Sequence, residues 1–104
     1  TTFAGCISLS SVPLFNTNKV TNMNWAFSQC TSLTSIPLFN TSKVSRMQST
    51  FDGCTNVQNG ALALYQQAST QTNPPGYHSE AFKNCGINTQ TGSAELAQIP
   101  SDWK

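Results

Sequence analysis

Residues 12–20 read Val-Pro-Leu-Phe-Asn-Thr-Asn-Lys-Val, and residues 36–44 read Ile-Pro-Leu-Phe-Asn-Thr-Ser-Lys-Val. The second stretch repeats the first with only two substitutions, at the fixed step that leads from Val12 to Ile36. A fixed step of this size predicts that one supersecondary unit is copied and that the copies stack against one another. We therefore expect a repeat architecture.

Phenylalanine and cysteine residues recur with the same step. The set consists of Phe3, Phe27 and Phe51 with Cys6, Cys30 and Cys54, and Phe82 and Cys85 keep the same mutual spacing. Equivalent positions of stacked repeats lie above one another, so we predict a structural ladder of these side chains. Free thiols are favoured over disulfides, because a bridge also requires the Cβ atoms of adjacent rungs to point at each other.

Each repeat divides into an extended segment and a segment with helical spacing. Residues 9–14 and 33–38 carry alternating apolar side chains and end near a proline, which predicts a short strand. Val20, Met23 and Phe27 then follow the spacing of a helix face, as do their counterparts one repeat later. The pattern predicts an α/β repeat, a solenoid of parallel short strands and short helices.

A left-handed residue is expected at the end of each short helix. Glycine or asparagine precedes three of the four cysteines, and both tolerate the left-handed conformation that terminates helices. Gln29 is the exception.

The repeat breaks after residue 59. Gly60 stands at a position that is apolar in the earlier copies, and the interval from Cys54 to Cys85 is longer than that from Cys30 to Cys54. The extra residues coincide with 61–68, which contain the best helix formers in the chain. We expect a helix there and a last short helix over residues 79–82.

The terminal repeat of a stacked array differs from the others, because one of its faces meets water. We therefore predict two regions. Residues 1–59 form repeats of about 24 residues, and residues 60–104 form a divergent last repeat with a C-terminal cap.

The composition excludes two classes of function, nucleic-acid binding and insertion into a membrane. Only 9% of the 104 residues are charged and the net charge is +1, with the five basic residues scattered, so nucleic acid is not an expected partner. The chain has no apolar span of membrane length, so membrane insertion is not expected. Thr1 begins in the middle of a repeat, and the remainder of a longer repeat array is an expected partner.

No catalytic constellation stands out. His78 is the single histidine, the four carboxylates lie far apart in the sequence, and the cysteines lack the Cys-x-x-Cys spacing of zinc sites. We predict that the protein is not an enzyme and has neither a metal site nor a cofactor.

Candidate binding residues lie where the repeat is not obeyed or where it places polar side chains on a surface. Trp25 points away from the predicted helix face and can anchor a partner or a sugar ring, or instead cover a neighbouring repeat. Tyr77 and His78 flank a proline turn, where they can contact a ligand or pack against the cap. Hydroxyl groups of the predicted strands would line the concave face, namely Ser10, Ser11, Thr34 and Ser35.

The repeat unit resembles a known family. Phe-x-x-Cys-x-x-Leu-x-x-Ile-Pro, followed by Phe-Asn-Thr-Ser-Lys-Val-x-x-Met-x-x-x-Phe, is similar to the BspA-like (Treponema pallidum-type) leucine-rich repeat of bacterial surface proteins. The resemblance covers residue 3 to about residue 57. It implies a short leucine-rich-repeat solenoid with strands on its concave face.

The resemblance also implies a function. We expect a non-enzymatic, adhesive module of a bacterial surface or secreted protein, located outside the cell, whose partner is a host or cell-surface protein or glycan. The alternative is a structural or receptor-attachment component of a phage-like particle, located in the virion. Flanking sequence separates the two, since a cell-wall anchor favours the first and a trimerising fibre segment favours the second.

Overall fold

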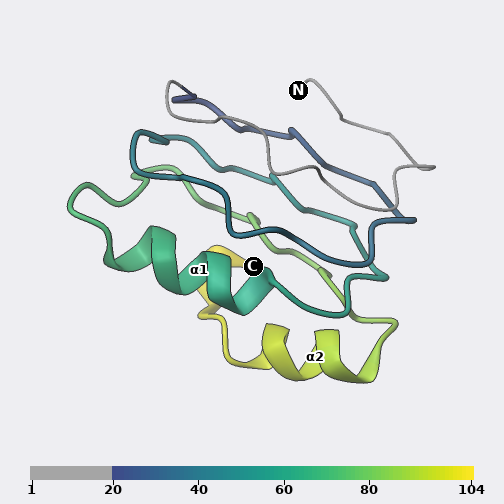
Figure 1. Ribbon diagram of the computed structural model, residues 1–104. Helices are drawn as coiled ribbons and strands as arrows, with labels where there is room; N and C mark the ends of the chain where they lie inside the picture. The colour runs from purple at the N-terminus through teal and green to yellow at the C-terminus, as the bar shows by residue number, and fades with distance from the viewer. Residues whose placement is uncertain (1–19) are drawn as a thin grey trace.

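The computed structural model describes residues 20–104. Within this range the chain forms helix α1 (Ala61–Thr70), helix α2 (Gln90–Ala97) and a 3₁₀ turn, η1 (Ser101–Trp103). Figure 1 shows three long segments lying side by side, with α1 and α2 along one border of the layer. We call these segments run 1 (22–30), run 2 (46–54) and run 3 (77–85).

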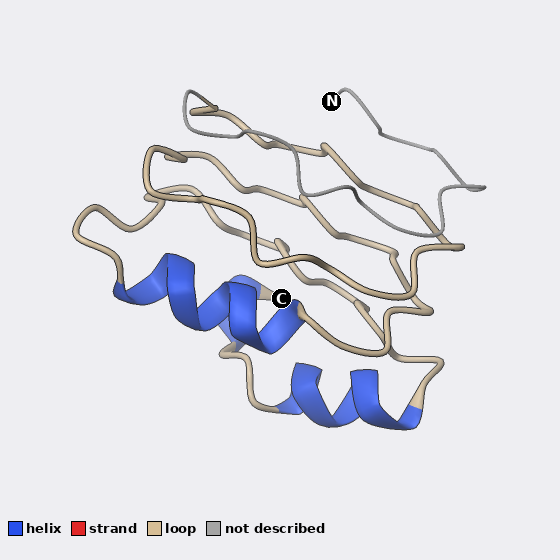
Figure 2. Ribbon diagram, in the orientation of Figure 1, coloured by secondary structure: helices blue, strands red, loops and turns tan. Residues whose placement is uncertain are grey.

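The predicted fold class is wrong. The described part of the chain contains no strand and no sheet, so a leucine-rich-repeat solenoid of parallel strands and short helices is not seen (Figure 2). Strand-like pairing in this part of the chain is limited to isolated parallel bridges, between Asn22 and Arg46, Arg46 and Tyr77, and Ser35 and Asn59. The short helices predicted at residues 20–27, 44–51 and 79–82 are absent as well.

Backbone hydrogen bonds between the runs replace both kinds of element. In runs 1 and 2 every second N–H donates to a carbonyl of the next run, and most of the intervening N–H groups donate three residues back within their own run. The N–H groups of Asn24 and Gln48 donate to side chains instead. From run 1 to run 2 the bonds are Met23 to Arg46, Trp25 to Gln48, Phe27 to Thr50 and Gln29 to Asp52. From run 2 to run 3 they are Met47 to Tyr77, Ser49 to Ser79, Phe51 to Ala81 and Gly53 to Lys83.

Left-handed residues explain why this ladder is neither helix nor strand. Two residues of each run have positive φ, and they occupy equivalent positions: Trp25 and Gln29, Ser49 and Gly53, Glu80 and Asn84. A residue with positive φ interrupts a helix and an extended strand alike. The expected left-handed position before the cysteines is therefore present, but no helix precedes it, and Gln29 adopts it too.

A stack of phenylalanine rings forms the centre of the core. Phe27 and Phe51 lie 5.4 Å apart between ring centroids, and Phe51 and Phe82 lie 5.6 Å apart, in nearly parallel planes. All three rings are buried. Trp103 ends the stack, with its ring centroid 6.4 Å from that of Phe82.

Helix α1 accommodates the extra residues between run 2 and run 3. It forms over the segment whose composition predicted a helix, and it buries Ala61, Leu64 and Ala68. Its polar side chains and Gln71 bond to the backbone of the preceding coil, where Gln67 Nε2 donates to Phe39 O at 2.7 Å and Gln71 Nε2 donates to Thr41 O at 2.8 Å. Gln67 and Gln71 thus provide donors to the carbonyl groups of Phe39 and Thr41.

Helix α2 and η1 lie at the end of the chain, beyond run 3. Thr89 begins α2 by accepting a hydrogen bond from Gly92 N at 2.8 Å, while its own hydroxyl donates to Val57 O. Neither α-helix of the described residues is long and apolar enough to cross a membrane.

Candidate functional site

The outer side of the three runs carries a regular arrangement of exposed and half-buried polar and aromatic side chains. Because the hydrogen bonds hold the runs in register, equivalent residues stand next to one another across the runs. We call this surface the polar face and define it by Asn22, Asn24, Trp25, Arg46, Gln48, Tyr77 and Ser79.

Amide side chains form one column of the polar face. Asn24 Nδ2 donates to Gln48 Oε1 at 3.2 Å, and Gln48 N donates to Asn24 Oδ1 at 2.9 Å. Gln48 Nε2 then reaches Ser79 Oγ at 3.4 Å. These contacts orient the amide groups, and a pre-oriented group loses less conformational freedom when it binds a ligand.

A second column contains Asn22, Arg46 and Tyr77. Parallel bridges connect Arg46 to both neighbours, so its backbone is fixed from two sides. The guanidinium carbon of Arg46 lies 4.4 Å from the centroid of the Tyr77 ring, which is a cation–π contact. Tyr77 remains 51% exposed. The column therefore presents a positive charge and an aromatic ring to solvent.

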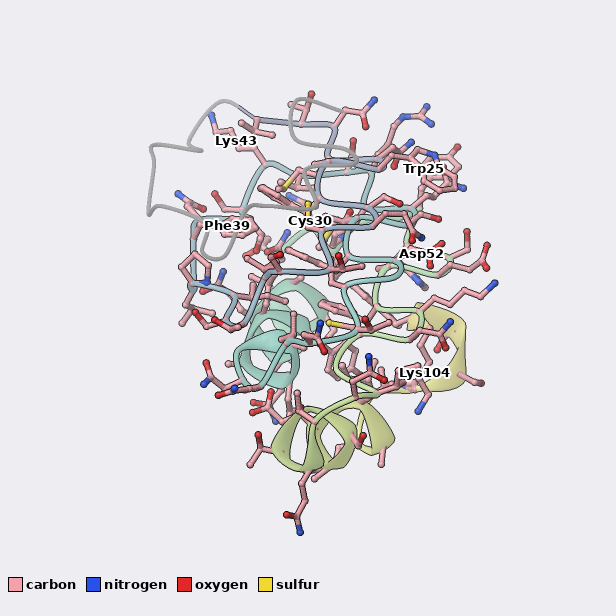
Figure 3. The ribbon with its side chains drawn as sticks, turned by 90° about the vertical axis from the view of Figure 1, so that its right-hand side faces the viewer. Trp25, Cys30, Phe39, Lys43, Asp52 and Lys104 are labelled. Carbon is pink, nitrogen blue, oxygen red and sulfur yellow. The ribbon has the colours of Figure 1, made fainter. Side chains whose placement is uncertain are left out.

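Trp25 stands beside the amide column. It is 48% exposed, and its backbone N–H donates to Gln48 O at 3.0 Å. Its backbone is left-handed, with φ of 63°, as are the equivalent residues of the other two runs. Figure 3 shows Trp25 and Asp52 on one side of the molecule, with Lys43 and Phe39 on the opposite side.

His78 is separated from Tyr77 although the two are adjacent in sequence. Its ring stacks on Trp103 with centroids 4.2 Å apart, and Nδ1 lies 3.0 Å from Asp102 O. Trp103 also makes an edge-to-face contact with Tyr65, with ring centroids 5.2 Å apart. Of the pair proposed from the sequence, Tyr77 belongs to the polar face and His78 packs against the C-terminal residues.

The strands that were predicted to carry the hydroxyl surface are absent from the described residues. Thr34 and Ser35 follow run 1, outside the polar face, where Thr34 O accepts from Gln58 N and Ser35 bridges to Asn59. Ser10 and Ser11 lie outside the described residues.

Sequence reasoning overlooked five members of the polar face, namely Asn22, Asn24, Arg46, Gln48 and Ser79. For four of them the repeat nevertheless offered a signal. Asn24 and Gln48 are one repeat step apart, as are Asn22 and Arg46, so the repeat places each pair side by side.

The cysteines lie on the inner side of the runs. Cys30, Cys54 and Cys85 are buried thiols, and Cys54 Sγ donates to Phe27 O at 3.0 Å. Burial raises the pKa of Cys54 from 9.0 to about 12, and burial raises that of Cys85 as well. Neutral, buried thiols of this kind are poor nucleophiles. Cys6 and Phe3 lie outside the described residues.

The charged groups of residues 20–104 are dispersed. No group of three or more His, Cys, Asp or Glu side chains in this range could hold a metal ion. Burial raises the pKa of Asp52, and nearby Lys83 lowers it in part. Lys83 Nζ forms an exposed ion pair with Glu80 at 2.7 Å, which raises the pKa of Lys83.

Comparison with known proteins gives a family. Residues 1–90 match the family described as "Mycoplasma protein of unknown function, DUF285". The chain belongs to this family. The match crosses the boundary predicted between residues 59 and 60, so the family unit includes run 3 and α1. No curated protein and no solved structure matches the chain.

Proposed function

We propose that this domain is a non-enzymatic binding module of a BspA-like bacterial surface or secreted protein, and that it binds a protein or a glycan through the polar face. The observation that carries the proposal is the pair of half-exposed aromatic residues, Trp25 and Tyr77, on either side of the oriented Asn24–Gln48 amides. Exposed aromatic rings are frequent anchors of binding surfaces, and amides supply hydrogen bonds that select the ligand.

The construction of this surface supports a binding role. Each residue of the polar face belongs to a run whose backbone is bonded to a neighbouring run, so the side chains start from fixed positions. The core beneath contains the stacked phenylalanine rings, which resist movement. A ligand would therefore meet a surface that needs little ordering on binding.

The family supports the proposed setting. Domains of this family are found in BspA-like surface repeat proteins, and the Phe-x-x-Cys and Ile-Pro-Leu-Phe-Asn-Thr elements of this chain resemble those repeats. We propose an extracellular location on that basis, with the domain presented as part of a longer repeat array.

The test is a binding screen with the purified domain against immobilised glycans and purified extracellular matrix proteins. We expect at least one ligand whose affinity falls about tenfold or more on Trp25→Ala, since truncating an interface anchor has effects of this size. Ile87→Ala is the matched control, because Ile87 is 47% exposed but lies outside the polar face. Ligands that bind equally well to Trp25→Ala and Tyr77→Ala would overturn the proposal, as would the absence of any ligand.

A further inference from the structure

Arg46 occupies the middle of the polar face. Its backbone bridges to Asn22 on one side and Tyr77 on the other, and its side chain is exposed. The guanidinium lies over the Tyr77 ring, 4.4 Å from the centroid. Stacking of this kind limits the rotamers of a long side chain, so the charge is held at a defined place.

No carboxylate of the described residues pairs with this guanidinium. Within residues 20–104, the one ion pair joins Lys83 and Glu80 at the other end of run 3. A cation–π contact orients the guanidinium but leaves its charge uncompensated, with N–H groups that can still donate to an anion. Arginine matches a carboxylate in particular, because its planar fork can donate two parallel hydrogen bonds.

The neighbours of Arg46 on the polar face are neutral hydrogen-bonding groups. Asn24 and Gln48 are bonded to each other in the adjacent column, and Asn22 Oδ1 accepts from Asn24 N at 2.9 Å. Amide groups can both donate to and accept from hydroxyls. Trp25 adds an exposed apolar ring next to these amides. One cationic group, several amides that can bond to hydroxyls, and an aromatic ring together match an acidic sugar.

We propose that the polar face binds saccharides that carry a carboxylate, with the carboxylate on Arg46, hydroxyls on the Asn24 and Gln48 amides, and Trp25 against a sugar ring. This inference rests on the proposed binding function and names its ligand class. It distinguishes the surface from one that binds neutral glycans, for which the Arg46 charge would be dispensable.

The experiment measures affinities of the domain for two matched pairs of probes. Trigalacturonic acid is compared with its methyl ester, and sialyllactose is compared with lactose, so each pair isolates the carboxylate. We expect at least one acid to bind about tenfold or more tightly than its neutral partner, and Arg46→Gln to abolish that preference, because charge-assisted hydrogen bonds contribute at this level. The pair that shows the preference tells a uronic acid from a sialic acid.

Lys43→Gln provides the charge-matched control. Lys43 is also an exposed cation, but it lies on the opposite side of the molecule from Trp25 (Figure 3). Lys43→Gln should leave the preference for the acidic probe intact. Equal melting temperatures of Lys43→Gln and Arg46→Gln establish that each variant is folded. Equal losses from Lys43→Gln and Arg46→Gln would overturn the inference in favour of unspecific attraction.

Two further outcomes separate this inference from the proposed function. Ligands that require Trp25 but bind Arg46→Gln as tightly as the wild type would overturn the acidic-sugar inference and leave the proposed function standing. Failure of every ligand in the broader screen would overturn both.

Discussion

Phe51 and Phe82 stack with ring centroids 5.6 Å apart, although the insertion lengthens the chain between them. Phe27 and Phe51 stack at nearly the same distance across one regular repeat. The additional residues form part of α1, which lies in the connection between run 2 and run 3. Run 3 is nevertheless bonded to run 2 in register. The ring stack therefore keeps nearly the same spacing whatever the length of the connection between the runs.

Removing the middle ring should destabilise the domain strongly. Phe51→Ala deletes a fully buried side chain that contacts rings on both sides. We expect a loss of about 3–5 kcal/mol in the free energy of unfolding, measured by urea denaturation. Leu38→Ala is the control, because Leu38 is exposed, and it should change stability by less than about 0.5 kcal/mol. Similar losses for the two variants would contradict this account of the core.

The side chains that form the core could be predicted from the sequence. The regular repeat step places Phe27 beside Phe51 whatever backbone connects them, and the preserved Phe-x-x-Cys spacing identifies Phe82 despite the insertion. Helix α1 could also be predicted, because residues 61–68 combine strong helix formers with an apolar face.

The backbone of the runs could not be predicted in the same way. Met23 and Phe27 are both buried, as residues four apart on a helix would be, but the run between them turns through Trp25 with positive φ. Burial at that spacing therefore fits two conformations. The choice between them comes from hydrogen bonds to residues of the neighbouring run, for which local sequence carries no signal.

Only some residues of the polar face could be predicted from the sequence, for a related reason. Trp25 can be singled out in the sequence because the repeat does not require a tryptophan there, and Tyr77 because it stands next to the proline turn. Arg46 and Gln48 gain their interest from neighbours in other runs, and the register that creates those contacts depends on the observed ladder.

Gly92 should tolerate no larger residue. A Cβ atom at this position would overlap the carbonyl oxygen of Val57 and the hydroxyl of Thr89, which begins α2. We expect Gly92→Ala to lower the free energy of unfolding by about 1–3 kcal/mol. At Gly76 a Cβ would meet nothing within 4 Å, so Gly76→Ala is a matched control with little expected effect. Comparable melting temperatures for the two variants would show that α2 can move away from Val57.

Gln71 should contribute more to the free energy of unfolding than Gln66, a nearby glutamine in α1. Its side chain donates to Thr41 O and accepts from Thr41 Oγ1, both at 2.8 Å, and Thr41 is fully buried. Gln71→Ala leaves both Thr41 groups without these partners, which should cost about 1–3 kcal/mol. Gln66→Ala, at an exposed position of α1, is the control. Urea denaturation of the two variants provides the measurement, and equal stability would contradict a clamping role for Gln71.

The buried thiols should make stability fall in alkaline solution. Burial raises the pKa of Cys54 from 9.0 to about 12 in the folded protein. Above about pH 9 the unfolded chain releases this proton while the folded chain retains it, so the thiol's contribution is fully present below that pH and is lost towards pH 12. Each such thiol lowers the free energy of unfolding by at most about 1.4 kcal/mol per pH unit in this window.

Cys54→Ala isolates this effect from the titration of tyrosine and lysine, which both proteins share. We expect the variant to be less stable than the wild type at about pH 8, because it loses a buried sulfur and its hydrogen bond to Phe27 O. Between about pH 8 and about pH 10, however, it should lose about 1 kcal/mol less than the wild type. Urea denaturation at the two pH values measures both quantities. Parallel losses in the two proteins would mean that the Cys54 thiolate is tolerated in the folded state, which is incompatible with a position sealed between neighbouring runs.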